Sequence, residues 1–513
     1  MDTKALRQKI LDLAIRGKLV PQDPNDEPAS VLLERIREEK KRMVKEGKLK
    51  AKDIKNDTII FKGEDNLHYE KFQDGTIKCI EDEIPFELPE GWEWTRLSSI
   101  ASIVTGSLDA NAQTENGNYP FFTCGEDVLQ TDSFAFDCDA ILLGGNNAVG
   151  DFKMHRYNGR FNAYQRVYVI TTYQDMNTDY LYYHTQYYLK HLQKISIGTQ
   201  TRYLKLGMIQ DLLISIPPKS MQSAIENRLR ELLSNICVID ITNSELIDDI
   251  SNTKSKILNL AISGKLVPQN PSDEPASVLL ERIRKEKEVL IKQGKLKRDK
   301  KESVIYKGDD NSYYEKLSDG TVMNIDDELP FEISDTWCWS RLSSLCIKEI
   351  KRGKAPKYVD KSNTLVFAQK CNLKKGGIDY TLSQYLDETT ISRYDDSEYL
   401  QKHDTVINST GTGTLGRVGF IDSLAECPIV PDSHVTTIRV SSEINQFYVF
   451  VLLKSLQSVL EKSGEGSTNQ KELKPNTLQD ILVPIPPMEE QKKICNAVHN
   501  SYNLIKKIED SIN

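Results

Sequence analysis

The sequence predicts an α+β fold in which one frame, used twice with approximate two-fold symmetry, carries two unlike inserts. Residues 9–50 recur at 256–297 with identity at 32 of 42 positions. The segments that follow start alike and then diverge, so that 101–215 and 346–483 share little. A heptad repeat joins the two halves. Since a repeated sequence unit indicates a repeated structural unit, two different modules are expected on one duplicated frame.

Each copy of the repeat is expected to contain two helices. The first ends at Gly-Lys-Leu-Val-Pro, which begins at Gly17 and at Gly264. The second follows Asp-Glu-Pro, because acid suits the positive end of a helix and proline suits its first turn. It ends at Gly47 or Gly294, as helices commonly do. The apolar positions of these second helices, expected to be core-packed or covered by a partner, include Leu32, Ile36, Leu279 and Ile283.

A long coiled-coil helix is predicted between the two inserts. From Ile225 to Leu260, steps of four and three residues mark eleven positions, nine of them apolar, and neither proline nor glycine interrupts 222–263. At 1.5 Å per residue this helix would span roughly 54 Å. Asn243 takes a core position, where a polar residue fixes register at a cost in stability.

The same heptad pattern is split between the two chain ends. Residues 494–512 match the start of the central helix, and residues 6–13 match its end. The tail and the head are therefore expected to form a second long helical element that packs antiparallel to the first. Two independent helical hairpins are the alternative.

The inserts are expected to be α+β domains. Short β-rich segments alternate with glycine turns, one helical stretch follows at 179–195 or 444–462, and a double proline ends each insert. The expected organisation is an N-terminal helical repeat at 1–56, a first variable domain at 57–218, a central coiled-coil repeat at 219–300, a second variable domain at 301–487 and a C-terminal helix at 488–513.

Composition and charge narrow the possible partners. The chain has no run of 18 apolar residues, no signal-like N-terminus and nine scattered cysteines without a Cys-x-x-Cys pair, which favours a reduced, cytoplasmic protein. The net charge of −8 argues against a wholly basic nucleic-acid binder but leaves local patches open. One patch, 348–375, holds nine basic and two acidic residues. A smaller patch consists of Lys153, Arg156, Arg160 and Arg166.

Catalytic motifs are weak throughout. Residues 411–416 fit G-x-G-x-x-G, but glycine and proline follow where a nucleotide site needs a helix. Asp432 and Glu472 superficially suggest a nuclease, yet forty residues separate them. Neither a metal-ligand spacing nor the Asn-Pro-Pro-aromatic motif of amino-group methyltransferases is present. No catalytic residue and no metal ligand is therefore expected in this chain.

Recognition of a split DNA site is what the sequence favours instead. Base edges are read by Arg, Lys, Asn and Gln, with Ser and Thr as adaptable partners. In the first insert the candidate DNA-binding residues are Asn146, Asn147, Arg156, Arg160, Gln200 and Arg202. In the second insert they are Lys351, Arg352, Lys354, Ser409, Thr410, Thr412, Arg417, Asn469, Gln470 and Lys471.

The paired motifs carry a family resemblance. They are K-I-L-x-L-A-I-x-G-K-L-V-P-Q with D-E-P-A-S-V-L-L-E-R-I-R, found twice, the entry at Trp92-Glu-Trp94, the Ile-Pro-Pro exits, and the glycine turn at 410–420 with Pro-Asp-Ser-His434. With these motifs the chain resembles the specificity subunits of type I restriction–modification systems. His434 joins the DNA-binding candidates through this motif.

The resemblance implies two target recognition domains, each reading one half of a bipartite DNA site. It implies helices that set the gap between the halves and dock two methyltransferase subunits, with restriction/translocase subunits as further partners. S-adenosylmethionine, ATP and magnesium would then be bound by partner subunits, with no cofactor in this chain. In the first insert, residues 143–150 depart from the glycine turn, which leaves open whether Asn146 and Asn147 correspond to Thr410 and Thr412. A self-contained DNA methyltransferase or nuclease, and a coiled-coil scaffold unrelated to DNA, are the alternatives.

Overall fold

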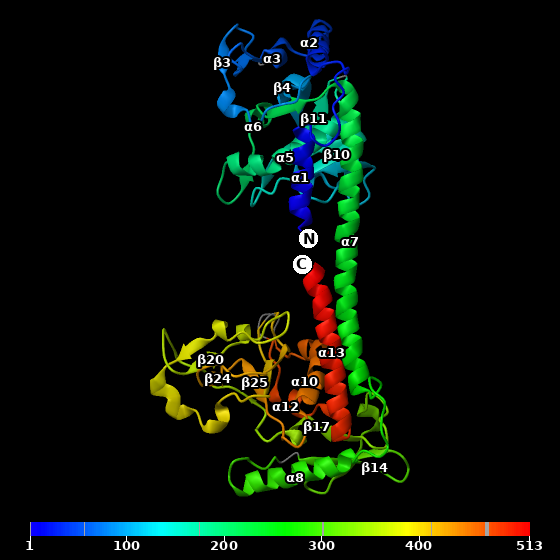
Figure 1. Cartoon of the computed structure of the whole chain (residues 1–513), viewed down its shortest axis with the longest axis vertical. Coiled ribbons are helices and arrows are strands. Elements are labelled where there is room, and N and C mark those ends of the chain that lie inside the picture. Colours follow the sequence, from blue (N-terminus) through cyan, green and yellow to red (C-terminus); the bar gives the residue numbers. More distant parts are fainter. Residues whose placement is uncertain are drawn as a thin grey trace. The chain divides into compact units, whose positions relative to one another are not determined.

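The computed structural model describes residues 2–55, 57–173, 175–299, 302–411, 413–466 and 471–512. Three predicted site residues, Thr412, Asn469 and Gln470, lie outside these ranges. The chain forms two compact units, Met1–Asn243 and Ser244–Asn513 (Figure 1). The division falls inside the longest helix and inside the predicted segment 219–300. Within the described ranges, no helix is long and apolar enough to span a membrane.

The first unit contains one copy of the recurring frame and a six-stranded sheet. Its helices are α1 (Thr3–Ile15), α2 (Ala29–Lys45), α3 (Ala51–Ile54), α4 (Leu97–Ile100), α5 (Thr178–Ile195), α6 (Leu206–Gln210) and the start of α7 (Lys219–Ile262). Its strands are β1 (Ile59–Lys62), β2 (His68–Lys71), β3 (Ile77–Cys79), β4 (Glu93–Arg96), β5 (Ala101–Thr105), β6 (Tyr119–Phe122), β7 (Leu129–Thr131), β8 (Phe136–Gly144), β9 (Asn146–Asn147), β10 (Met154–Ala163), β11 (Val167–Thr172), β12 (Arg202–Tyr203) and β13 (Leu213–Ile216).

The second unit repeats this order with a different insert. Its helices are the end of α7, α8 (Ala276–Lys292), α9 (Leu342–Leu345), α10 (Gln446–Ser455), α11 (Gln457–Lys462), α12 (Pro475–Gln479) and α13 (Met488–Ile512). Its strands are β14 (Ser303–Lys307), β15 (Tyr313–Leu317), β16 (Val322–Asn324), β17 (Cys338–Arg341), β18 (Lys351–Arg352), β19 (Tyr358–Val359), β20 (Leu365–Phe367), β21 (Gln384–Leu386), β22 (Thr405–Asn408), β23 (Val418–Phe420), β24 (Ile429–Pro431), β25 (Val435–Ile438) and β26 (Leu482–Ile485).

The two inserts differ in their sheets. In the first unit one sheet has the strand order β5-β11-β8-β10-β6-β7, and its buried strands and α5 share an apolar core. In the second unit two four-stranded sheets, β18-β25-β22-β23 and β19-β21-β20-β24, take its place. Each insert is closed by a two-stranded pair, β13 with β4 or β26 with β17, just before a long helix. Both inserts are thus α+β, as the sequence predicts.

The long helix α7 confirms the predicted coiled-coil segment. Of its eleven heptad positions only Thr253 is exposed, and Asn243 is half-buried. In the first unit α1 lies antiparallel to α7, because Arg7 pairs with Asp240 at 3.2 Å while the far end of α1 reaches β13 (Figure 1). In the second unit α13 lies antiparallel to the other half of α7, with Lys254 and Glu509 2.7 Å apart. Whether the chain ends complete a second long element stays a prediction.

Several polar contacts of the frame repeat in both units. The guanidinium of Arg96 joins Glu70 and Glu83, each at 2.7 Å, and that of Arg341 joins Glu315 at 2.6 Å and Glu328 at 2.8 Å. Buried lysines Lys40 and Lys287 donate to the main-chain carbonyls of α4 and α9. The predicted helix positions Leu32, Ile36, Leu279 and Ile283 are each 1% exposed. They are therefore packed in the core of their own unit rather than open to a partner.

Candidate nucleic-acid interface

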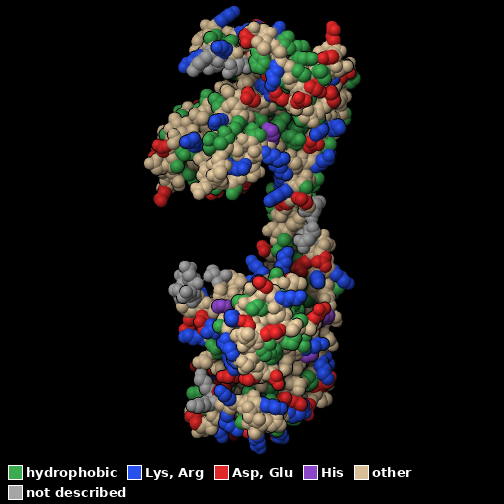
Figure 2. All heavy atoms as spheres, turned by 90° about the vertical axis from the view of Figure 1, so that its left-hand side faces the viewer, with side chains coloured by type: hydrophobic (Ala, Val, Ile, Leu, Met, Phe, Trp, Pro, Cys, Tyr) green, Lys and Arg blue, Asp and Glu red, His purple; other side chains and the backbone are tan. Residues whose placement is uncertain are grey.

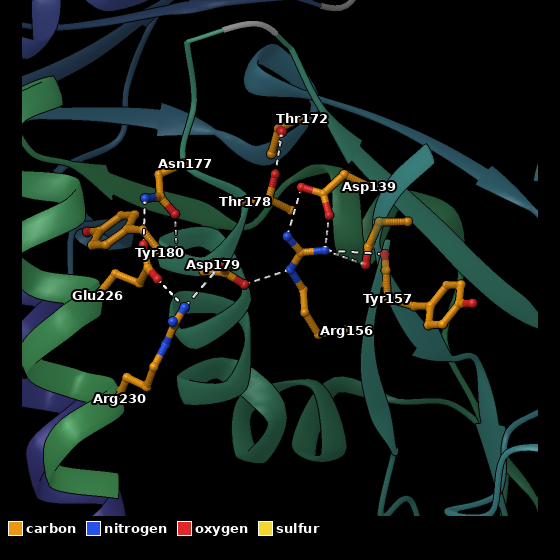
Figure 3. A network of polar contacts seen from close by, with 11 residues as sticks. Asp139, Arg156, Tyr157, Thr172, Asn177, Thr178, Asp179, Tyr180, Glu226 and Arg230 are labelled. Atoms are coloured by element: carbon orange, nitrogen blue, oxygen red, sulfur yellow. Dashed lines mark hydrogen bonds and ion pairs between the residues drawn. The ribbon is translucent and has the colours of Figure 1, made fainter. Parts of the chain in front are cut away.

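Arg156 is held inside the first insert. Its guanidinium donates to Asp139 from β8 and, at 2.8 Å, to Asp179 from α5 (Figure 3). Asp179 also lies 3.7 Å from Arg230 of α7, and Asn177 donates to Glu226 of α7 at 2.9 Å. With two carboxylates around it and 20% of its side chain exposed, Arg156 ties the sheet, α5 and α7 together. That is a structural role, and a DNA contact by Arg156 stays a prediction.

The other cations of the small basic patch differ in whether a carboxylate pairs with them. Arg160 pairs with Asp137 at 3.0 Å and lies over the ring of Phe134, and Lys153 pairs with Asp151 at 2.9 Å. Arg166 is exposed, and no carboxylate among the described residues lies within ion-pair distance of it. The sequence pattern predicted this patch. The structure shows that, among the described residues, Arg166 is the cation of the patch that no carboxylate neutralises.

A short ribbon brings together the other candidates of the first insert. Asn146 and Asn147 of β9 pair with Tyr203 and Arg202 of β12. The Arg202 guanidinium donates to the carbonyl of Gln193 at 2.7 Å, so its side chain lies along the end of α5. Gln200 is exposed in the hairpin before β12. Beside this ribbon lies an open hollow lined by Ala148, Val149, Lys190, Gln193, Lys194, Thr199 and Arg202.

In the second insert a glycine turn occupies the corresponding place. Thr410 Oγ1 and His434 Nδ1 lie 2.7 Å apart, and the side-chain amide of Gln369 donates to Thr410. The Arg417 guanidinium donates to Asn372 O at 2.7 Å and to Gly413 O at 3.1 Å, so it braces the turn from within. Thr410 and the exposed His434 remain at the surface.

Ser409 corrects one sequence-based expectation. Its side chain is fully buried and its hydroxyl lies 2.6 Å from that of Thr436. A side chain enclosed in this way cannot reach a base or a phosphate. The Ser-Thr pattern predicted a polar turn, but Ser409 directly follows the fully buried strand β22 and is enclosed with it.

The large basic patch of the second insert is partly neutralised from within. Lys351 and Lys354 lie 3.1 and 3.5 Å from the buried Glu398, and Arg352 lies 2.8 Å from Glu472. Burial, assisted by the neighbouring Arg439, lowers the pKa of Lys348 to about 8. Lys361, Lys370, Lys374 and Lys375 of this patch are exposed, and so is Lys357, which pairs with Asp387 at 2.6 Å. On the face drawn in Figure 2, acidic and basic side chains are likewise interspersed over each unit.

Main-chain hydrogen bonds show which turn residues correspond. Gly145 N donates to Arg166 O at 2.7 Å, and Leu204 N donates to Gly145 O at 2.8 Å. In the second insert Ser409 N donates to His434 O, and Leu473 N donates to Ser409 O, both at 2.8 Å. Asn146, which follows Gly145, therefore corresponds to Thr410, and Asn147 corresponds to Gly411. The partner of Asn146, Tyr203, corresponds to Glu472, the partner of Thr410.

No cluster of three or more His, Cys, Asp or Glu side chains suited to a metal ion occurs in the part of the chain that the structure describes. The histidine buried deepest, His184, accepts a hydrogen bond from Ser215 N at 3.0 Å. Burial lowers the pKa of His184 to about 3, so its imidazole is neutral and structural.

The chain is similar in sequence to several known proteins. A family described as the type I restriction modification DNA specificity domain matches residues 89–250 and 346–513. The specificity subunit of the type I restriction enzyme EcoAI of Escherichia coli is 30% identical over 416 residues, 67% of this chain and 62% of the relative. That of EcoEI, also from Escherichia coli, is 25% identical over 98% of this chain and 89% of the relative. The crystal structure of the HsdS subunit from Thermoanaerobacter tengcongensis is 14% identical over 84% and 94% of the two chains, with a TM-score of 0.43.

Proposed function

Because the chain belongs to the type I restriction–modification DNA specificity family, we propose that it selects the DNA sequence on which a methyltransferase and restriction complex acts. Each of its two recognition domains contacts one half of a bipartite, asymmetric site. The observation that carries this proposal is the pair of family domains on a duplicated frame, whose turns share a main-chain geometry and differ in side chains. The chain itself carries out no chemistry in this proposal.

Phosphate contacts would supply much of the affinity. The exposed Lys471 and the half-buried Arg202 stand at the two turns without carboxylate partners among the described residues. Each phosphate contact releases counterions from the duplex, so binding falls steeply with salt. The net charge of −8 is compatible with this, since only the turns need to be positive.

The repeated frame supports two copies of one partner, which we propose to be methyltransferase subunits. Because Leu32 and Leu279 are buried, contact must fall on exposed frame residues. Both three-stranded sheets present a stacked aromatic pair, Phe61 with Tyr69 and Tyr306 with Tyr314, each with ring centroids 5.9 Å apart. Restriction/translocase subunits would join that assembly. S-adenosylmethionine, ATP and magnesium would then be held by these partners, and the complex would act in the cytoplasm, where the DNA is.

The helices that flank the recognition domains would set the gap between the half-sites. In support, α1 and α13 each pack antiparallel to a part of α7. We propose that the head and the tail of the chain together act as the counterpart of α7.

Replacing residues 101–215 by the insert of another family member tests the proposal. Methylated sites are sequenced from cells that carry the complete system, before and after the exchange. One half-site should change while the other half and the gap stay the same. A change in both halves would contradict the modular assignment. Methyl transfer or cleavage by the purified chain alone, with S-adenosylmethionine or magnesium, would favour the self-contained enzyme instead.

A further inference from the structure

The two recognition domains can be matched residue by residue around their turns, beyond the hydrogen bonds already described. Asn177 caps α5 and Asn445 caps α10, and Tyr180 and Tyr448 donate to the carbonyls of Ser215 and Pro484 at 2.7 and 2.8 Å. Counting from the two caps, Lys194 at the end of α5 corresponds to Lys462 at the end of α11.

The hairpins that follow these helices match as well. Ile197 bridges to Tyr203 in the first domain, and Glu465 bridges to Glu472 in the second. The residue before the second member of each bridge is basic, Arg202 in one domain and Lys471 in the other. The two hairpins therefore place a cation at the same point.

A pair of glycines establishes that Arg166 and His434 occupy equivalent positions. A Cβ on Gly106 would lie 2.1 Å from Ala163 O, and one on Gly353 would lie 2.1 Å from Pro431 O, so neither site tolerates a side chain. Gly106 N donates to Val167 O at 3.1 Å, and Gly353 N donates to Val435 O at 2.9 Å. Arg166 directly precedes Val167, and His434 directly precedes Val435. The two glycine contacts therefore hold Arg166 and His434 at equivalent positions next to Asn146 and Thr410.

The matched positions fall into two groups. Lys194 with Lys462, and Arg202 with Lys471, keep a positive charge in both domains, and no carboxylate among the described residues pairs with any of the four. Asn146 with Thr410, Arg166 with His434, and Tyr203 with Glu472 keep the main-chain position and change the chemistry. Phosphates are the same in every sequence, whereas base edges differ.

From this division, and resting on the proposed function, we infer that the constant cations hold DNA phosphates and that Arg166 and His434 read bases. Arg166 presents a guanidinium whose paired donors suit the O6 and N7 atoms of guanine in the major groove. The exposed His434 has Nδ1 at 2.7 Å from Thr410 Oγ1, so Nε2 is the ring nitrogen left to bond a base. Arg166 therefore specifies a guanine in the first half-site, and His434 contributes a single hydrogen bond in the second.

The test uses the full chain in complex with its methyltransferase subunits and a library of randomised duplexes, sequenced after methylation. Arg166→Ala should relax one position of the first half-site, with guanine preference falling roughly 10- to 100-fold. The second half-site should stay unchanged. His434→Ala should relax one position of the second half-site only.

Arg202→Ala and Lys471→Ala are the matched controls. Each should weaken binding to all sequences alike and lower the salt slope by about one. Uniform weakening by Arg166→Ala with the same loss of salt slope, or an unaltered base preference, would overturn the inference while leaving the proposed function intact. A wild-type complex that methylates no bipartite sequence preferentially would overturn the function itself.

Discussion

The duplicated frame and the recognition domains have diverged in different ways. In the frame, side chains as well as main chain correspond: Arg96 and Arg341 hold equivalent glutamate pairs, and Lys40 and Lys287 donate to equivalent carbonyls. In the recognition domains the main-chain anchors, the capping asparagines and a few cations correspond, but the other turn side chains and the sheets differ. The frame is constrained by its own internal contacts, whereas the turns are constrained only where their backbone is anchored.

The largest expected effect tests whether the two frame copies contribute equally to the stability of their units. Leu32→Asp and Leu279→Asp each place a carboxylate where a side chain is 1% exposed. Each should destabilise its own unit by at least about 4 kcal/mol, as burial of an unpaired charge in a core requires. Denaturant unfolding followed by hydrogen exchange locates the loss in one unit.

The exposed neighbours provide the control for that pair. Val31 and Val278, 40% and 38% exposed, should tolerate aspartate with a change below about 1 kcal/mol. A mild effect of Leu32→Asp together with lost co-purification of methyltransferase subunits would instead identify Leu32 as an interface residue.

A second prediction concerns the arginine–glutamate clusters. Arg96→Ala and Arg341→Ala should each cost about 3–5 kcal/mol, because removal of one partner leaves the nearly buried Glu70 or Glu315 uncompensated. Unequal losses in the two units, measured by urea unfolding at neutral pH, would show that the frame copies are not energetically equivalent.

The same clusters predict a response to acid. Burial tends to raise the pKa of Glu70 and Glu315, but hydrogen bonds from the arginines hold both below the usual value. A lowered pKa in the folded state means that this stabilisation is complete above the unfolded pKa and is lost as pH falls through the folded one. In the alanine variants the corresponding part of the acid-induced loss of stability should vanish in urea titrations below pH 5.

A third prediction uses a place where the frame copies differ. Glu490, in the first turn of α13, is 1% exposed and accepts a hydrogen bond from Trp337 at 3.0 Å, whereas Met221 occupies the same position in the first turn of α7. Burial raises the pKa of Glu490, so its contribution to stability is present at low pH and is lost as pH rises through that pKa. Glu490→Gln keeps an acceptor for Trp337 and should stabilise the second unit by about 1 kcal/mol at pH 8. No gain over wild type in thermal melts at pH 8 would contradict this.

The smallest expected effect is that of Asn243, half-buried at its heptad position in α7. Asn243→Leu should raise thermal stability by less than about 1 kcal/mol, since apolar area is buried at the seam. Broader calorimetric unfolding in the variant would indicate that the asparagine fixes register. A lowered melting temperature would argue against a core position.

Much of the fold could be predicted because residues that are buried at regular intervals are apolar at regular intervals in the sequence. The heptad from Ile225 to Leu260 predicted α7, and the 42-residue repeat predicted two copies of the frame. The candidate site was harder, since charge runs do not reveal their partners. Arg156 and Arg160 belong to the same basic run as Arg166, yet carboxylates from β8, and from α5 for Arg156, neutralise them. Ser409 was misplaced because a turn pattern does not say which side chains point inward.

The anchors of the two turns have a consequence for how such a protein changes over time. Gly145 N, Arg166 O and their counterparts in the second domain are main-chain atoms, which survive exchange of almost any outward-facing side chain. Selection for a new target can therefore act on a few solvent-facing positions without first rescuing the fold. Under the proposed function, a chain that recognises a different DNA sequence differs from this one by a small number of substitutions.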